Sequence, residues 1–372
     1  MVRILFFIHD LMHGGAEKVL VNLVNNMDSD KFDITVMTLF NEGVHIKNLN
    51  QNIKYKYCFN KSFKGNSKIL SLVSPQRLYK KFIKDDYDIL VSYLEGSCTR
   101  IISGCPDDSV KKVAWVHIEQ GEKEFCYSYK NYNEAVECYK TFDNIVCVSN
   151  SVKDNFIGHS KISDKVEVLY NTNESEKIKL LSKEEINNEK FKNNDEIKLC
   201  GVAKVLPNKG FMRLARVHKK LIEEGIQHHI YILGVGEEMK KIQQYLDDNN
   251  LQDTFTFLGY DENPYKYVAN SNLFVCASFA EGFSTATTEA LIVGTPVLTT
   301  LCAGMKEMLG ENNEYGIIVE NNEDALYEGL KDILQNKDKL AHYKEQAKKR
   351  GTVFSTDKTV NAVQDMFLNL LK

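Results

Sequence analysis

The sequence contains little proline and no long low-complexity stretch. Five prolines occur in 372 residues, and no repetitive polar tract interrupts the periodic segments. A hydrophobic content of 43% and a formal net charge of −4 are typical of a folded globular protein of about two domains. The composition therefore excludes a disordered chain and requires short linkers.

No apolar run approaches the roughly 20 residues that a membrane-spanning helix needs. The first apolar run, residues 3–8, is followed at once by the ionisable residues His9 and Asp10, and no small-residue cleavage site comes after it. We therefore expect a buried first strand, and neither a secretory signal nor an integral membrane protein.

The cysteines are also missing the patterns that bind metals or form disulfide frameworks. Nine are present, an odd number, without a C-x-x-C pair or a Cys/His cluster at zinc spacing. This predicts a protein of the reducing cytoplasm. Cys147 and Cys276 lie within apolar runs and are predicted to be buried, inert thiols.

Apolar runs alternate with amphipathic segments along the chain, which is typical of βαβ units on parallel sheets. The predicted strands are residues 3–8, 32–39, 53–59, 87–94, 111–118, 144–149, 166–170, 197–204, 228–234, 253–260, 271–278, 295–300 and 315–320. Helices are predicted between most of them, including single helices near residues 68–84 and 131–140.

A charged, Asn-rich segment after residue 174 separates two such series. We predict an α/β protein with an N-terminal domain (1–173) and a C-terminal domain (174–353), both doubly wound and Rossmann-like, with a ligand cleft between them. The closing segment, 354–372, has apolar residues at helical spacing and is predicted to pack back on the first domain.

The stretch EGFSTATTE, residues 281–289, lies between a predicted strand and a predicted helix. Ser284 or Thr285 can cap that helix, whose first amides and dipole favour an anion such as a diphosphate. Glu281 and Glu289 can each accept hydrogen bonds from two hydroxyl groups of a diol. The stretch is thus suited to a sugar nucleotide. A solvated Glu281 and a Glu289 that only favours the start of its helix are the alternative, and the residues in isolation favour it.

Upstream, the stretch GVAKVLPNKGF, residues 201–211, has two lysines between a predicted strand and the helix that follows it. Lys204 ends a strand and Lys209 starts a helix, so both ammonium groups can reach one diphosphate and neutralise a leaving nucleoside diphosphate. Ordinary solvated lysines remain the alternative.

Weaker candidates follow other strand ends. Gly234 and Tyr260 are candidate nucleotide contacts, and Gly14 and Gly15 can approach a phosphate or an acceptor. His117 ends an apolar strand, where an imidazole can hydrogen-bond a sugar hydroxyl or act as an acid or base. A purely structural histidine is the alternative.

Together these stretches resemble glycosyltransferase family 4, the retaining transferases with the two-domain GT-B fold. The resemblance runs through nearly the whole chain and is strongest over residues 258–300, where Glu281 and Glu289 occupy the E-x7-E motif. WVH, VCVSNSV and VLYNTNE in the first half also match. The resemblance to this family implies transfer of a hexose from a nucleotide sugar with retention of the donor's anomeric configuration. It also implies that no catalytic metal is needed.

The resemblance also implies roles for single residues. Glu281 would contact the donor hexose and Glu289 the ribose hydroxyls, with Lys204 and Lys209 on the diphosphate. The backbone of Gly282, Phe283 and Ser284 would face the sugar, and His117 matches a histidine near the donor hexose. Lys204 stands where the family commonly has arginine. The lysine keeps the positive charge but lacks the bidentate fork of arginine.

A basic, aromatic region covers residues 53–84, which contain no acidic residue. Its cations are Lys54, Lys56, Lys61, Lys64, Lys68, Arg77, Lys80, Lys81 and Lys84. This pattern predicts attraction to an anionic membrane surface, with a solvated helix face as the alternative. Nucleic-acid binding fits poorly, because the net charge is negative and no recognisable module is present.

The sequence therefore predicts a cytoplasmic, membrane-peripheral retaining glycosyltransferase. Its donor would be a UDP-hexose, and its acceptor a lipid-linked glycan of bacterial capsule, exopolysaccharide or lipopolysaccharide synthesis. A non-catalytic sugar-nucleotide-binding subunit and a GT-B epimerase or synthase are the rival hypotheses. The donor hexose, the linkage and the oligomeric state are not encoded in these motifs.

Overall fold

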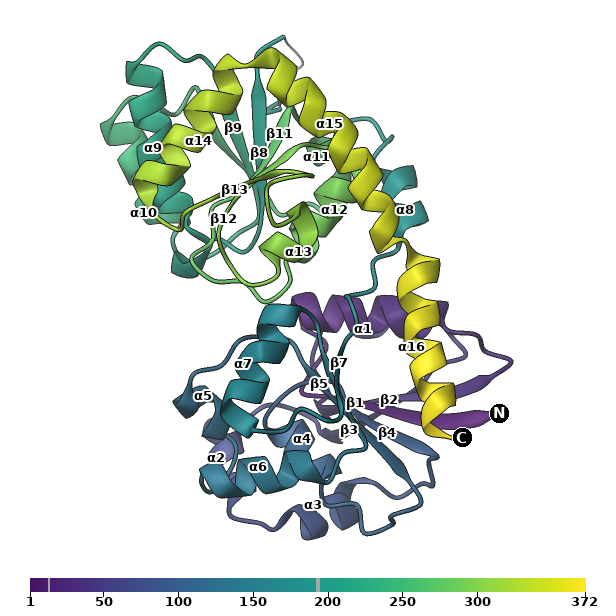
Figure 1. Ribbon diagram of the computed structural model, residues 1–372. Helices are drawn as coiled ribbons and strands as arrows, with labels where there is room; N and C mark the ends of the chain where they lie inside the picture. The colour runs from purple at the N-terminus through teal and green to yellow at the C-terminus, as the bar shows by residue number, and fades with distance from the viewer. Residues whose placement is uncertain (13, 192–194) are drawn as a thin grey trace. The chain divides into compact units, whose positions relative to one another are not determined.

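The computed structural model describes residues 1–12, 14–191 and 195–372 (Figure 1). The chain divides into two compact units, of which the first comprises residues 1–173 with 356–372, and the second comprises residues 174–355. Each unit is a parallel β-sheet flanked by helices.

The first unit has a seven-stranded sheet in the order β3-β2-β1-β4-β5-β6-β7, with every neighbouring pair parallel. The strands are β1 (Val2–Ile8), β2 (Phe32–Phe40), β3 (Lys54–Phe59), β4 (Ile89–Ser92), β5 (Lys111–Val116), β6 (Asn144–Cys147) and β7 (Val166–Val168). Residues 4–8 in the middle of the sheet have no exposed surface, as expected for a strand covered by helices on both faces.

The helices of the first unit connect these strands. They are α1 (Gly15–Asn26), α2 (Asn66–Ser71), α3 (Pro75–Phe82), α4 (Ser97–Ile102), α5 (Glu122–Cys126), α6 (Tyr132–Lys140), α7 (Asn150–Ser160) and the C-terminal α16 (Thr356–Leu370). A 3₁₀ turn spans Ile46–Asn48.

The C-terminal helix α16 packs on the first unit. The Phe367 ring meets Phe6 of β1 edge-on at a centroid distance of 5.9 Å, and the Gln364 side chain accepts a hydrogen bond from the Asp28 amide at 2.7 Å. Val360, Val363 and Phe367, on the apolar stripe, are buried. The stripe that is visible in the sequence is therefore the packing face of the helix.

The second unit has a six-stranded sheet in the order β10-β9-β8-β11-β12-β13, again with parallel neighbours. The strands are β8 (Lys198–Val202), β9 (His229–Leu233), β10 (Phe255–Gly259), β11 (Leu273–Cys276), β12 (Val297–Thr300) and β13 (Ile317–Val319). All thirteen strands predicted from apolar runs are thus present, and Cys147 and Cys276 are buried as predicted.

Two groups of helices cover this second sheet. They are α8 (Ser175–Leu181), α9 (Phe211–Glu223), α10 (Met239–Asp248), α11 (Tyr265–Ala269), α12 (Thr285–Val293), α13 (Met305–Leu309), α14 (Glu323–Gln335) and α15 (Lys337–Gly351), with 3₁₀ turns at Pro207–Lys209 and Thr352–Phe354. Helix α9 packs on α10 and α14, whereas α12 packs on α8, α11 and α15, and Figure 1 shows the two groups on opposite faces.

The single helix predicted over residues 68–84 is wrong. The chain forms two short helices, because Ser74 caps α3 through the Arg77 amide and Pro75 occupies its first turn. A proline there has no amide hydrogen to continue α2 and is well suited to start a new helix. The break leaves Ile69, Leu72 and Val73 exposed at the α2–α3 junction.

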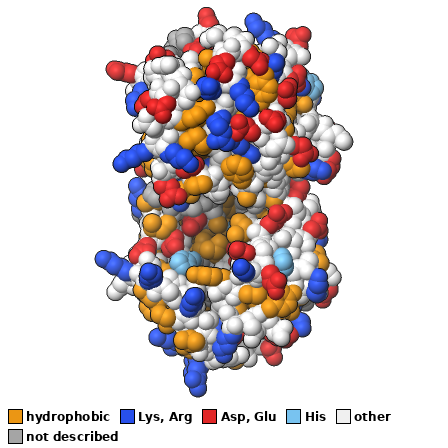
Figure 2. Space-filling view, turned by 90° about the vertical axis from the view of Figure 1, so that its left-hand side faces the viewer, with side chains coloured by type: hydrophobic (Ala, Val, Ile, Leu, Met, Phe, Trp, Pro, Cys, Tyr) orange, Lys and Arg blue, Asp and Glu red, His pale blue; other side chains and the backbone are white. Residues whose placement is uncertain are grey.

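Acidic and basic side chains are interspersed over the face drawn in Figure 2, with apolar side chains between them. None of the helices among the described residues is long and apolar enough to cross a membrane.

Candidate active site

The candidate site of the second unit is at the point where its strand order reverses. Strands β8 and β11 are neighbours in the sheet but are far apart in the chain. Ligands of doubly wound sheets bind at the carboxyl ends of such a pair. The segments leaving these two ends are residues 203–210 and 277–284, and they hold six of the thirteen predicted site residues.

Backbone contact brings these two segments together. Gly210, which precedes α9, has φ +70°, and a Cβ atom there would lie 1.9 Å from the Ala277 carbonyl oxygen. The Phe279 amide donates to the Asn208 carbonyl at 2.8 Å. Only glycine allows both this conformation and this approach, so Gly210 fixes the spacing of the segments.

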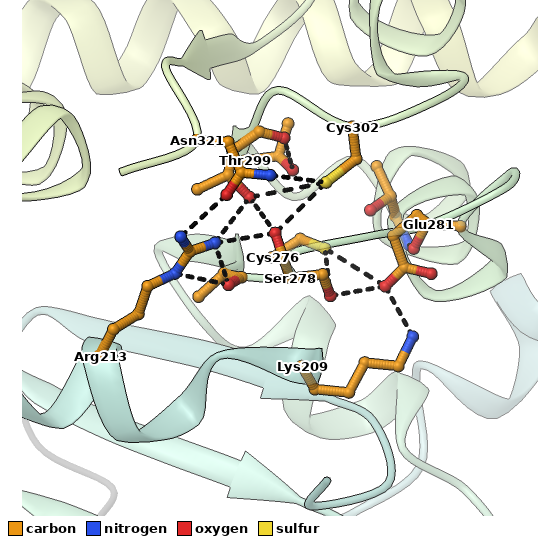
Figure 3. A network of polar contacts seen from close by, with 12 residues as sticks. Lys209, Arg213, Cys276, Ser278, Glu281, Thr299, Cys302 and Asn321 are labelled. Atoms are coloured by element: carbon orange, nitrogen blue, oxygen red, sulfur yellow. Dashed lines mark hydrogen bonds and ion pairs between the residues drawn. The ribbon is translucent and has the colours of Figure 1, made fainter. Parts of the chain in front are cut away.

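Lys209 and Glu281 meet across this contact, as Figure 3 shows. The Lys209 Nζ atom lies 2.7 Å from Glu281 Oε1, and the Ser278 hydroxyl donates to the same oxygen at 2.6 Å. Both charged side chains are largely covered. A cation and a carboxylate, predicted separately from motifs 72 positions apart, thus form one charged pair at the switch point.

Helix α12 begins where the sequence predicts. The Ser284 side chain accepts a hydrogen bond from the Thr287 amide at 3.3 Å, so Ser284 is the cap, and Thr285 is the first helical residue. Gly282, Phe283 and Ser284 are buried in the turn before it.

Glu289 is only 5% exposed within this helix. The Tyr265 hydroxyl donates to its Oε1 atom at a long 3.4 Å. A carboxylate at this position can accept hydrogen bonds from hydroxyl groups such as those of a diol.

The remaining nucleotide candidates take different places. Lys204 is exposed two residues beyond β8, and Tyr260 is 61% exposed directly after β10. Gly234 has φ +134°, and a Cβ atom there would lie 1.9 Å from the Ala203 carbonyl oxygen. Backbone packing alone therefore explains the glycine at position 234.

In the first unit, His117 follows β5 and is 7% exposed. Its ring lies 5.0 Å from that of Tyr93, and no described residue is a hydrogen-bond partner of its Nε2 atom. Burial lowers the pKa of His117 to about 4, so the imidazole is neutral at pH 7. A neutral ring with an unused nitrogen can hydrogen-bond a ligand hydroxyl.

Sequence reasoning missed Glu95, which follows β4. Its carboxylate accepts hydrogen bonds from the backbone amides of His117 and Ile118 and fixes the loop after β5. Burial raises the pKa of the Glu95 carboxyl group. The available signal was an acidic residue directly after the buried run ILVSYL.

Gly14 and Gly15 lie at the start of α1, with Gly14 as the residue before the first turn. A Cβ atom at Gly14 would meet the Glu17 carboxylate at 1.8 Å. Gly14, Gly15 and His117 belong to the first unit, whereas the other candidate residues belong to the second.

The sequence contains the D-x-D triplets 28–30 and 86–88, a spelling that can bind metals, and one aspartate of each has an ion-pair partner of its own. Asp88 pairs with Arg3 at 3.0 Å, and Asp28 pairs with Lys31 at 3.0 Å. The described part of the chain contains no group of three or more His, Cys, Asp or Glu residues placed to hold a metal ion.

Comparison with known proteins identifies the fold. The protein is similar to the structure of Anabaena Alr3699/HepE in complex with UDP, with a TM-score of 0.80, 16% identity, and coverage of 99% of this chain and 100% of that one. The same Anabaena protein in complex with UDP-glucose gives a TM-score of 0.75 and 18% identity, covering 99% and 100%. The two doubly wound units are those of a GT-B glycosyltransferase.

Sequence comparison then identifies the family. The model described as "Glycosyltransferase Family 4" matches residues 13–173, and that described as "Glycosyl transferases group 1" matches residues 182–350. The chain belongs to glycosyltransferase family 4.

A curated relative matches over nearly its full length. The chain is 28% identical to the N-acetylgalactosamine-N,N'-diacetylbacillosaminyl-diphospho-undecaprenol 4-alpha-N-acetylgalactosaminyltransferase of Campylobacter jejuni, covering 95% of this chain and 96% of the relative.

Proposed function

We propose that this glycosyltransferase moves a hexose or N-acetylhexosamine from a UDP-sugar to a lipid-linked glycan in bacterial surface polysaccharide synthesis, such as capsule, exopolysaccharide or lipopolysaccharide. The observation that carries the proposal is the Lys209–Glu281 pair at the β8–β11 switch point, beside the helix that holds Glu289. The Campylobacter relative, whose name specifies a diphospho-undecaprenol acceptor, and the Anabaena structures with UDP and UDP-glucose support it.

In this proposal the second unit binds the donor. Lys204 and Lys209 neutralise the diphosphate, Glu289 accepts the ribose hydroxyls and Glu281 accepts hydroxyls of the hexose. In the same proposal, the turn before α12 presents its backbone to the sugar, and Tyr260 meets the base. In the first unit, His117 is neutral and its Nε2 has no hydrogen-bond partner among the described residues, so its imidazole can bind a sugar hydroxyl.

We propose that the reaction retains the donor configuration by attack on the face from which the leaving group departs. The bond from the anomeric carbon to the phosphate oxygen breaks, and a bond to the acceptor oxygen forms. The acceptor proton passes to the leaving phosphate, so no protein nucleophile is required. Lys209 stabilises the charge that develops on that phosphate. We propose that no metal ion takes part, and turnover in EDTA tests this step.

Thermal stabilisation by a panel of nucleotides and UDP-sugars tests donor binding, since a ligand bound only by the folded state raises the melting temperature. We expect UDP to stabilise the protein and one UDP-sugar to stabilise it more. Transfer by the isolated chain to a lipid-linked acceptor would exclude a non-catalytic subunit. Conversion of the donor without an acceptor would instead indicate an epimerase, and a requirement for a sugar phosphate would indicate a synthase.

The two glutamates are expected to separate nucleotide binding from sugar binding. Glu289→Gln should weaken UDP binding by about tenfold or more, because one acceptor of the ribose diol becomes a donor. Glu281→Gln should leave UDP affinity within about twofold and remove the additional affinity for the UDP-sugar. Isothermal titration calorimetry measures both. Equal UDP affinities for the two variants would contradict the ribose assignment.

We also propose that the basic region, residues 53–84, holds the enzyme on the inner face of the cytoplasmic membrane. All nine of its cations are exposed, although Lys54 pairs with Asp33 and Lys56 with Asp85. At the α2–α3 junction Leu72 is 79% exposed, next to exposed Ile69 and Val73. Exposed apolar side chains among cations favour insertion between anionic head groups.

Sedimentation with vesicles tests the membrane proposal. The protein should bind phosphatidylglycerol vesicles, bind phosphatidylcholine vesicles poorly, and dissociate as salt rises. The Ile69→Ser/Leu72→Ser double variant should lower the partition coefficient by about tenfold or more. Leu180→Ser, which alters an exposed leucine of the second unit, is the matched control. Equal binding to both vesicle types would reject the electrostatic part of the proposal.

A further inference from the structure

Arg213, in the first turn of α9, is buried, with 2% of its surface exposed. Among the described residues it forms no ion pair with a carboxylate. Burial lowers the pKa of its guanidinium, which nevertheless stays protonated, as arginine does in proteins. A buried charge of this kind is costly, and the helix needs no arginine at this position for its own stability.

All the hydrogen bonds of this guanidinium go to the strand ends around the switch point (Figure 3). Nε donates to the Ala277 carbonyl at 2.9 Å, and Nη2 donates to the carbonyls of Ala277 and Ser278, the latter at 2.8 Å. Nη2 also reaches the Thr300 hydroxyl at 3.2 Å, and Nη1 donates to Asn321 Oδ1 at 2.8 Å. The guanidinium therefore joins the ends of β11, β12 and β13.

The Phe279 ring covers one face of the guanidinium plane, with its centroid 4.0 Å from Cζ. Together, the hydrogen bonds and the ring hold the consecutive residues 277–279. Ser278 then donates to Glu281 at 2.6 Å, and the Thr300 hydroxyl donates to the Ser278 carbonyl at 2.6 Å. A continuous chain of contacts thus leads from Arg213 through Ser278 to the carboxylate of Glu281.

We propose that Arg213 is a positioning residue for donor-sugar recognition, which sets the 277–281 loop so that Glu281 meets the hexose. The inference rests on the proposed function, because it requires Glu281 to contact the sugar. Lysine cannot replace Arg213, since one ammonium group lacks the planar fork that reaches three strand ends and stacks on an aromatic ring.

Arg213→Lys tests the proposal. The probes are UDP and the better bound of UDP-glucose and UDP-N-acetylgalactosamine. UDP affinity should stay within about threefold of wild type, whereas the extra affinity from the sugar should be lost. The kcat should fall by about 100-fold, the effect of misplacing a group by about 1 Å. Arg216→Lys is the matched control, because Arg216 lies one turn further along α9 and pairs with Glu323 instead.

A double-variant cycle with Glu281→Gln separates positioning from general stability. If Arg213 acts through Glu281, the double variant should lose little more kcat than the more damaging single variant. If Arg213 only stabilises the fold, the kcat losses of the two single variants should multiply in the double variant, and UDP binding should also weaken. Either result would overturn the inference.

Phe279→Ala guards against failure of the arginine variant to fold, because 51% of the Phe279 surface is exposed. The Phe279→Ala variant should keep the melting temperature of the wild type. Its gain in affinity from UDP to the UDP-sugar, the sugar increment, should be several-fold smaller, and an unchanged increment would count against the inference. A wild-type protein that binds UDP and the UDP-sugar equally would reject the proposed function and this inference together. A wild-type sugar increment that survives in Arg213→Lys would reject only the role of Arg213.

Discussion

Lys209→Met is expected to lower kcat by about 10²- to 10³-fold, the usual cost of removing one group that stabilises charge in a transition state. The change removes the cation that lies 2.7 Å from Glu281 Oε1 and that we place on the leaving diphosphate. Methionine keeps the length of the side chain without its charge. Steady-state kinetics with the donor varied measures the loss, which should be mainly in kcat.

Lys219→Met provides the control, since Lys219 is a lysine on α9 that pairs with Glu223 away from the switch point. Its kcat should stay within about twofold of wild type. A Lys209→Met enzyme within threefold of wild type would place the diphosphate elsewhere.

Stability is expected to decrease steeply as the pH falls from about 6.5 to 4. His218 of α9 is fully buried; its Nδ1 lies 2.8 Å from His228 Nε2, and its Nε2 lies 2.9 Å from the Thr254 hydroxyl. Burial lowers the pKa of His218 to about 2 and also lowers the pKa of His228, with His229 adding repulsion to His218. An acidic group also lies near this cluster, since the Glu196 carboxylate is 3.7 Å from His229 Nδ1.

The sign follows from proton binding. A histidine binds a proton near pH 6.5 in the unfolded chain but much lower in the folded one, so acid favours the unfolded chain. At pH 5, His218 alone should decrease the free energy of unfolding by about 2 kcal/mol relative to pH 7.5. Urea unfolding at both pH values, followed by circular dichroism, measures the difference.

His218→Gln should be less stable at pH 7.5 but less sensitive to acid, because one buried titrating group is gone. His342→Gln, which changes an exposed histidine of α15, is the control. An acid response of His218→Gln equal to that of the wild type would show that other groups cause it.

The sheet strands could be predicted from the sequence because each is a short apolar run, and burial on both faces requires such a run. The cap of α12 was also readable, since Ser284 acts on an amide three residues away. The break between α2 and α3 was missed because the apolar and basic spacing continues across it, although Ser74-Pro75 was the local signal.

The site was harder to predict because its contacts join distant parts of the chain. Both members of the Lys209–Glu281 pair were named, but the sequence does not contain their 2.7 Å contact. Arg213 was missed because an arginine in an amphipathic helix normally belongs to the exposed face. Its neighbours Leu214 and Val217 are buried, and only the fold shows that Arg213 is buried with them.

The connection between the units has a consequence for the gene. The second unit is one uninterrupted stretch, residues 174–355, and both termini of the chain belong to the first. The chain leaves the first unit after Asn173 and re-enters it at Thr356, where the Thr356 hydroxyl donates to the Asn173 carbonyl at 2.8 Å. The second unit thus begins and ends at neighbouring points, like a domain inserted into a host, a geometry that proteins tolerate well. If the second unit binds the donor as we propose, exchange of its coding segment with that of a relative, with junctions at these two residues, should transfer donor preference onto an unchanged first unit.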